Sequence, residues 1–441
     1  MIEQSERRQL RYAWYVVCVL TLCYTLSFID RTILSFLVGP IKHDLGVSDT
    51  RIGQLLGFAF ALFYTFLGLP MGWLADRYHR GRIIAAGIVC WSIMTAVCAA
   101  TTSYIGLFLA RMGVGIGEAA LAPSAFSLIA DYFPKNRLSR ALSLYSVGVF
   151  GGSGIALLAG GLIVHAVSGH PPVTVPLLGT IASWRLTFLI VGLPGVLVAL
   201  WVLLLREPVR KDTLRAASGA DARLSLAEIV RHALLRWQSI IGLGVGMGLI
   251  AFCNYGLGAW APTLLQRLYG WGPGRAGPVL GLITVVFGCL GLAVGGLMTD
   301  RWQSAGVRAA PIRTCLISAI GGGIAITAAL ASDSVGATLA LLAPANFFLA
   351  LPTGASYAAV QAVLPNQVRG QVSAVFLLCL NLIGAGLGPF FPGYFSNHLF
   401  HDEQRIGSAM LVSFLGATVL ASVIFAAMRG AYRRHHALMQ P

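Results

Sequence analysis

Long runs of apolar residues, separated by short polar segments, dominate the chain. An α-helix needs about 20 apolar residues to cross the ~30 Å hydrocarbon core of a bilayer. Twelve runs approach or exceed that length, and we expect each to form one transmembrane helix. The predicted spans are residues 14–38, 52–74, 83–101, 104–130, 140–167, 184–205, 239–265, 276–299, 312–331, 335–363, 371–398 and 407–428. The pattern therefore predicts an all-α membrane protein.

The composition points to the same class. Hydrophobic residues make up 57% of the 441 residues and charged residues only 11%, whereas soluble domains carry about 25% charged residues. There is too little polar surface to cover a water-soluble body of this size. All eight cysteines fall within predicted helices, so we interpret them as small packing residues and expect no metal site and no cofactor.

Lysine and arginine are distributed unevenly between the predicted loops. With the N-terminus in the cytoplasm, 23 of the 31 basic residues fall on the cytoplasmic side, six on the opposite side and two inside the helices. The positive-inside rule then places both termini in the cytoplasm, with the chain in the cell (inner) membrane. Basic loops that contact anionic membrane lipid explain the net charge of +15, so we expect no nucleic-acid partner.

The sequence repeats itself at an offset of 224 residues. The coinciding positions include a glycine, an aspartate and an arginine at the ends of the second and eighth spans: Gly72 and Gly296, Asp76 and Asp300, Arg77 and Arg301. Two six-helix halves in parallel orientation are a known transporter plan, with the substrate site near the midplane between them. We expect halves at 1–205 and 239–441, joined by a basic linker at 206–238. Within the linker, residues 224–235 have the pattern of an amphipathic helix on the cytoplasmic face.

Four charged residues lie inside predicted helices: Asp30 and Arg31 in the first, Arg111 and Glu118 in the fourth. A charge at membrane depth costs about 2.5–3.5 kcal/mol on insertion scales, and such residues are usually functional. Arg111 and Glu118 are seven residues apart, hence about 10 Å apart along the helix axis, which disfavours a direct pair. We expect Asp30 to pair with Arg111, and Glu118 to pair with Arg31 or with water.

Counting charges suggests what this cluster does. It is neutral when both carboxylates are ionised, and one added proton leaves it positive because arginine stays charged. Protonation can therefore free an arginine to bind a phosphate or a carboxylate. We assign proton coupling to Asp30 and Glu118, and substrate binding to Arg31 and Arg111. The alternatives are a structural ion pair between helices 1 and 4 for Asp30 and for Glu118, and a gate or packing role for Arg31.

The loop after the second span carries a compact motif, GWLADRYHRGR, at residues 72–82. It resembles the signature of the major facilitator superfamily, and residues 296–301 resemble a weaker copy of it. The resemblance covers essentially the whole chain and implies the major facilitator fold, in which two six-helix halves rock around a midplane site. It also implies which residues brace the cytoplasmic gate, namely Asp76, Arg77, Arg80, Asp300 and Arg301.

Three further segments, residues 28–35, 109–118 and 127–134, resemble the spinster-like transporters of that superfamily. The resemblance implies a proton-coupled secondary transporter, not an enzyme, that moves an amphipathic lipid-derived anion such as a lysophospholipid or a sphingoid phosphate. A neighbouring branch of proton-coupled organic-anion symporters also carries an Asp-Arg pair in helix 1, so a small organic anion such as a sugar acid is the alternative. No G-x-x-x-x-G-K-[ST] loop occurs, which argues against direct ATP drive. We expect a monomer.

The same resemblance implies that helices 1, 4, 7 and 10 line the transport pathway. The polar candidates for substrate binding in the second half are Asn254 and Tyr255 on helix 7 and Asn346 on helix 10. Each such residue alone is more often a packing hydrogen bond than a ligand contact. A membrane sensor that has lost transport is a competing hypothesis, but the retained carboxylates and the complete gate motif weigh against it.

Overall fold

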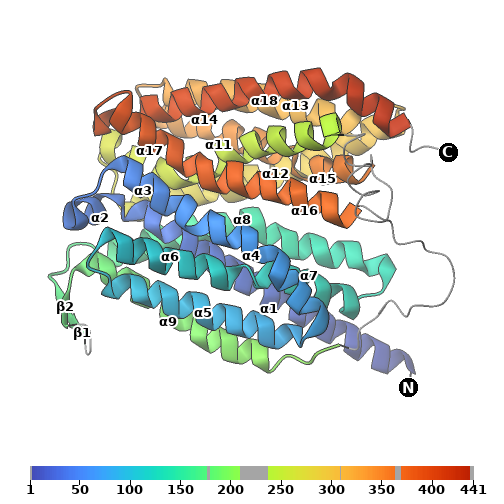
Figure 1. The fold of residues 1–441 in the computed structure, drawn as a ribbon, viewed down its shortest axis with the longest axis horizontal. Helices are drawn as coiled ribbons and strands as arrows, with labels where there is room; N and C mark the ends of the chain where they lie inside the picture. Colours follow the sequence, from blue (N-terminus) through green and yellow to red (C-terminus); the bar gives the residue numbers. More distant parts are fainter. Residues whose placement is uncertain (1, 176–178, 209–236, 308, 363–368, 438–441) are drawn as a thin grey trace. The chain divides into compact units, whose positions relative to one another are not determined.

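The computed structural model describes residues 2–175, 179–208, 237–307, 309–362 and 369–437. Within these residues, twelve helical spans are long and apolar enough to cross a membrane. The predicted fold class is confirmed: the protein is an all-α, multi-pass membrane protein (Figure 1).

The first half of the sequence forms α1 (Ile2–Phe36), α2 (Val38–Leu45), α3 (Asp49–Leu56), α4 (Phe58–Arg77), α5 (Arg80–Ala100), α6 (Tyr104–Glu118), α7 (Leu121–Tyr132), α8 (Lys135–Val167) and α9 (Ser183–Leu203). A small antiparallel hairpin, β1 (Val173–Val175) and β2 (Gly179–Ile181), lies between α8 and α9. The second half forms α11 (Trp237–Tyr269), α12 (Pro273–Ser304), α13 (Ala310–Leu330), α14 (Val335–Ala350), α15 (Thr353–Ala362), α16 (Arg369–Cys379), the π-helix η2 (Leu380–Leu387), α17 (Gly388–His398), the 3₁₀ turn η3 (Glu403–Arg405) and α18 (Ile406–Ala437).

Four spans are each built from more than one helix. The second span is interrupted at Gly57, between α3 and α4, and the fourth at residues 119–120, between α6 and α7. The tenth is interrupted at Pro352, which has no backbone N–H to continue a helical ladder. The eleventh passes through the π-helix η2, a form often found at functional sites.

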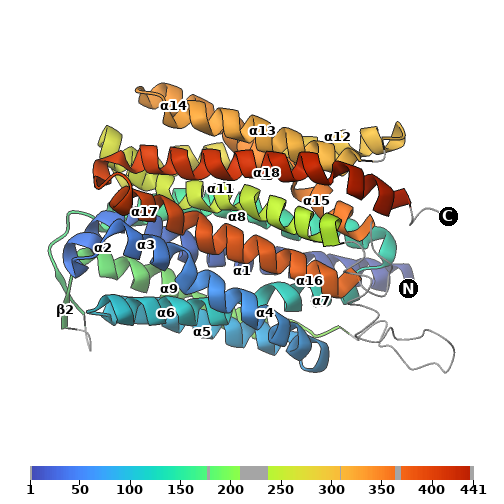
Figure 2. The ribbon, with the colours of Figure 1, turned by 45° about the horizontal axis from the view of Figure 1, so that its top comes forward.

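One compact unit comprises residues 1–47, 59–218 and 271–282. In this unit α5 lies along both α6 and α9 (Figures 1 and 2). Glycine makes the close approach to α6 possible, because a Cβ on Gly117 would lie 2.7 Å from the carbonyl oxygen of Gly87. This packing fixes α6, which carries two of the predicted site residues.

The other compact unit comprises residues 48–58, 219–270 and 283–441. Here α11 lies along α18 and η2 (Figure 2). Close packing again depends on glycine, since a Cβ on Gly256 of α11 would lie 2.7 Å from the carbonyl oxygen of Gly388. The short helix α3 packs on α17 within this unit.

Each unit therefore contains a short segment from the opposite half of the sequence. Residues 48–58 group with the second unit and 271–282 with the first. Adding the repeat offset of 224 to 48–58 gives 272–282, so the exchanged segments are equivalent positions of the repeat. The predicted division at the linker 206–238 stays a prediction, and its amphipathic helix at 224–235 lies outside the described residues.

Candidate functional site

The four charged residues predicted at membrane depth gather where α1 meets α6 in the first unit. Asp30 is 2% exposed, and Arg111 and Glu118 are each 1% exposed. The Arg31 guanidinium binds Glu118, with its Nε 2.6 Å from the Oε2 of that carboxylate. The predicted cross-helix pairing of Glu118 with Arg31 is present, and it joins α1 to the last residue of α6.

Arg111 contacts Asp30 in a different way from the one predicted. Its Nη1 donates a hydrogen bond of 3.0 Å to the main-chain carbonyl of Asp30, not to the carboxylate. Among the described residues, Oδ1 of Asp30, Oε1 of Glu118 and Nε of Arg111 have no hydrogen-bond partner, although all three atoms are buried. Buried polar atoms are nearly always paired, so this cluster has capacity for protons, water or a ligand.

Aromatic rings surround the Arg31 guanidinium. Its central carbon lies 4.2 Å from the ring centroid of Phe60, 4.8 Å from that of Tyr64 and 5.2 Å from that of Phe28. A cation over an aromatic face is stabilised by the ring quadrupole, by about 0.5–2 kcal/mol. The rings can therefore hold the Arg31 cation in place even when its carboxylate partner is neutralised.

The candidate residues of the second half lie in the second unit. Asn254 and Tyr255 are half-buried on α11, and Tyr255 lies beside Gly384 of η2. Asn346 is half-buried on α14, and its Nδ2 donates 2.9 Å to the carbonyl of Leu342 within the same helix. The Asn346 contact is a hydrogen bond within its own helix, of the kind that polar residues make in helix packing. Across the part of the chain that the structure describes, no group of three or more His, Cys, Asp or Glu side chains is placed to hold a metal ion.

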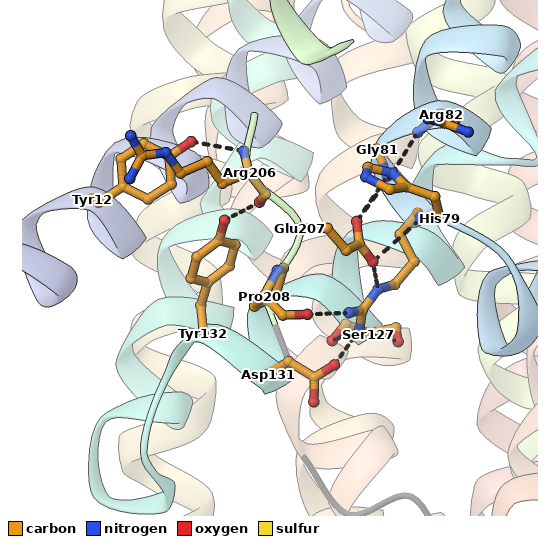
Figure 3. Close-up of polar contacts among 11 residues, drawn as sticks. Tyr12, His79, Gly81, Arg82, Ser127, Asp131, Tyr132, Arg206, Glu207 and Pro208 are labelled. Atoms are coloured by element: carbon orange, nitrogen blue, oxygen red, sulfur yellow. Dashed lines mark hydrogen bonds and ion pairs between the residues drawn. The ribbon is translucent and has the colours of Figure 1, made fainter. Parts of the chain in front are cut away.

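The predicted gate loop is organised around Arg80, which is 1% exposed (Figure 3). Its Nε donates 2.6 Å to Glu207, and its Nη1 donates to the carboxylate of Asp131 and, at 3.1 Å, to the carbonyl of Ser127. By contrast, Arg77 is exposed and lies over the ring of Trp73. Arg80 is thus the buried cation of this loop. The exposed gate candidates are Asp76, Arg77, Asp300 and Arg301.

Two partners of Arg80, Asp131 and Glu207, are not among the residues predicted for the gate. Asp131 falls within the quoted segment 127–134, but nothing in the sequence shows that it faces Arg80. Glu207 is 127 residues away from Arg80 and begins the predicted linker. The sequence did not single it out, because Glu207 is one of four acidic residues in the segment 206–238.

A second buried ion pair, in the second unit, was also missed. Asp49, the first residue of α3, is fully buried and accepts two hydrogen bonds from Arg267 of α11, at 2.6 and 2.8 Å. Ser396 of α17 donates a third hydrogen bond of 3.0 Å to Asp49. Beside it, the Thr50 amide donates 2.8 Å to the side chain of Asn397. These contacts fasten the segment 48–58 within the second unit.

Replacing Asp49 with asparagine should destabilise the protein by about 2–3 kcal/mol, because Arg267 loses its buried counter-charge and keeps only the exposed Glu403, at 4.0 Å. Thermal unfolding of the purified protein measures the loss. A matched control is Asp44→Asn, since Asp44 binds Arg185 at 2.9 Å but its side chain is 36% exposed, and exposed pairs contribute about 1 kcal/mol or less. Equal shifts in melting temperature for the two variants would contradict the assignment.

Comparison with known proteins now identifies the family. The family model of the Major Facilitator Superfamily matches residues 20–389. The chain belongs to the major facilitator superfamily. An MFS-type efflux pump of Mycolicibacterium smegmatis is 30% identical to it, over 98% of this chain and 96% of that protein. A probable L-galactonate transporter of Escherichia coli is 28% identical, over 73% of this chain and 68% of that protein.

A solved structure from the superfamily is also close to this one. It is the crystal structure of a bacterial homolog of the human lysosomal transporter Spinster, in an inward-facing and unoccupied conformation. The two chains are 28% identical with a TM-score of 0.76, over 97% of this chain and 98% of that one. The protein is therefore a spinster-like member of the superfamily, and these relatives are transporters, not enzymes.

Proposed function

We propose that this transporter is proton-coupled and moves an amphipathic lipid-derived anion, such as a lysophospholipid, by alternating access. The observation that carries the proposal is the buried cluster of Asp30, Arg31, Arg111 and Glu118. Two carboxylates in it each have a buried oxygen without a partner among the described residues. Ionisable groups at membrane depth that keep unpaired atoms are typical of proton relays and substrate sites.

The contacts of Arg31 indicate how protonation of Glu118 is coupled to binding of the cargo. With Asp30 and Glu118 ionised, the cluster has two negative and two positive charges. A proton on Glu118 removes one negative charge and weakens its ion pair with Arg31. Arg31 stays charged and stays among its aromatic rings, so it becomes available to an anionic headgroup. Release of the proton restores the Arg31–Glu118 pair, which competes with the cargo for the same guanidinium.

The other arginine has a different role in this proposal. Arg111 is almost fully buried and bonded to the main chain of Asp30, so it contributes positive charge and positions helix α1. Asn254, Tyr255 and Asn346 remain proposed contacts for the cargo. We further propose a monomer in the cell inner membrane with both termini in the cytoplasm, on the distribution of basic residues.

Two observations support the proposed cargo class: the chemistry of the residues around Arg31 and the similarity to known transporters. Arg31 offers a cation for a phosphate or carboxylate, and the surrounding Phe28, Phe60 and Tyr64 offer apolar surface for an acyl chain. Similarity to a Spinster homolog favours this class. The second candidate is a small organic anion such as a sugar acid, which the similarity to a probable L-galactonate transporter favours. Similarity to an efflux pump favours export as the direction.

A thermal-shift comparison in lipid nanodiscs separates the two candidates. Any ligand that binds the folded state stabilises it, by about 2.7 kcal/mol at a concentration of 100 Kd. We expect lysophosphatidic acid to raise the melting temperature, while lysophosphatidylcholine, which has no net charge, does not. A shift with galactonate but not with neutral galactose would instead support the sugar-acid transporter. If neither anion stabilises the protein, both cargo classes are wrong.

A further inference from the structure

The residues that follow α9 are fastened to the elements around the gate loop (Figure 3). The amide of Arg206 donates 2.9 Å to the hydroxyl of Tyr12, and the hydroxyl of Tyr132 donates to the carbonyl of Arg206. The Glu207 carboxylate accepts the hydrogen bond from Arg80 described above. The first residues of the predicted linker therefore belong to the same polar network as the gate loop.

His79 makes two contacts that one protonation state cannot satisfy. Its Nδ1 accepts a hydrogen bond of 3.3 Å from the amide of Arg82 and so caps the N-terminus of α5. The same Nδ1 lies 3.3 Å from Oε2 of Glu207. A ring nitrogen is an acceptor when it lacks a proton and a donor when it carries one. The neutral ring protonated at Nε2 therefore caps α5, whereas the charged ring donates to Glu207 and gives up the cap.

The charges around Glu207 leave room for a second cation. Arg80, the buried cation beside it, divides its guanidinium between Glu207 and Asp131. Tyr12 and Tyr132 use their hydroxyl groups for hydrogen bonds to the main chain of Arg206. Among the described residues, the remaining charged side chains near the loop are exposed and therefore screened by water and salt: Asp76, Arg77, Arg82 and Arg206. A proton on His79 thus adds a positive charge beside a carboxylate that, within the part of the chain that the structure describes, is bound by one arginine side chain and by the backbone amides of Arg80 and Gly81.

We propose that His79 is a proton-sensitive site of the gate, separate from the carboxylates at membrane depth. Protonation of His79 fastens the start of the linker to the gate loop, because Glu207 is then held by two cations. Histidine is the side chain that changes its charge between about pH 5 and 8, so acidification of this face of the protein strengthens the contact. Where the halves alternate as proposed above, the stronger contact favours the conformation in which Arg206 and Glu207 are held beside the gate loop. The fastening itself does not depend on the cargo or on proton-driven transport.

Hydrogen exchange of the purified full-length protein tests the proposal without any cargo. The readout is protection of the peptide that carries Arg206 and Glu207, measured at pH 6.0 and 8.0 and corrected for the intrinsic exchange rate. In the wild type we expect about two- to fivefold greater protection at pH 6.0, the range for a partly exposed ion pair. His79→Asn keeps an oxygen that can cap α5 but cannot be protonated, so its protection should be the same at both pH values. Glu207→Gln should lose the pH difference too.

The controls make a negative result decisive. His170→Asn removes an exposed histidine of the loop between α8 and β1 and should behave as the wild type. Size-exclusion chromatography and thermal unfolding check that each variant is folded, and His79→Gln replaces His79→Asn if the latter is not. The proposal is wrong if a folded His79 variant keeps the pH difference of the wild type, or if Glu207→Gln keeps it.

Discussion

Replacing Glu118 with glutamine should reduce proton-driven transport at least tenfold. Glutamine cannot release a proton, so Arg31 permanently lacks the carboxylate that it binds at 2.6 Å. The site then stays in the state that accepts an anion, and a pH gradient can no longer reset it. The measurement is the initial rate of cargo movement in proteoliposomes under an imposed pH gradient, with the anion that stabilises the protein in the thermal-shift comparison.

An exchange assay distinguishes lost coupling from lost folding. Exchange of labelled for unlabelled cargo across the membrane, with no pH gradient, needs alternation but no net proton movement. Glu118→Gln should retain this exchange, because glutamine resembles the protonated carboxyl group in shape and charge. Full gradient-driven transport by the variant would remove Glu118 from the mechanism.

Replacing Arg111 with glutamine should destabilise the protein by about 3–5 kcal/mol, the range for leaving a buried charge uncompensated. Arg111 is 1% exposed, and its loss removes the hydrogen bond to the Asp30 carbonyl. It also removes one of the two positive charges beside the buried carboxylates Asp30 and Glu118, while Glu118 keeps its bond to Arg31. A fall in the thermal unfolding temperature of the purified protein measures this effect.

Two further variants show whether charge is the cause. Arg137→Gln changes an exposed arginine at the start of α8 and should shift stability by less than about 0.5 kcal/mol. The double variant Arg111→Gln with Asp30→Asn removes one charge of each sign and should recover part of the lost stability. If Arg111→Gln shifts the melting temperature no more than Arg137→Gln, the charge of Arg111 is not structurally important.

The sequence predicts the spans well because crossing a bilayer needs long apolar runs, and such runs are a local property. It does not predict where a span is interrupted. The break at residues 119–120 follows Glu118 and precedes Pro123, but a proline alone does not predict a break, because Pro194 lies inside the continuous helix α9. Likewise, nothing local distinguishes the π-helix η2 from the α-helices on either side. Both depend on contacts with neighbouring helices, which hydropathy does not record.

The candidate site likewise contains some contacts that the sequence predicts and others that it does not. The Arg31–Glu118 pair could be predicted because four buried charges must neutralise one another, and the helical spacing excludes a pair within α6. The hydrogen bond from Arg111 to a main-chain carbonyl could not be predicted, since every residue has such a carbonyl. Asp49 and Arg267 are 218 residues apart, and in the sequence each is an ordinary loop-flanking charge. Only the fold shows that they are partners.

The exchange of residues 48–58 and 271–282 between the compact units bears on whether the two halves can be separated. A cut within the linker would separate each of these segments from the unit with which it groups. The two halves should therefore be more stable when they are expressed together than when either is expressed alone.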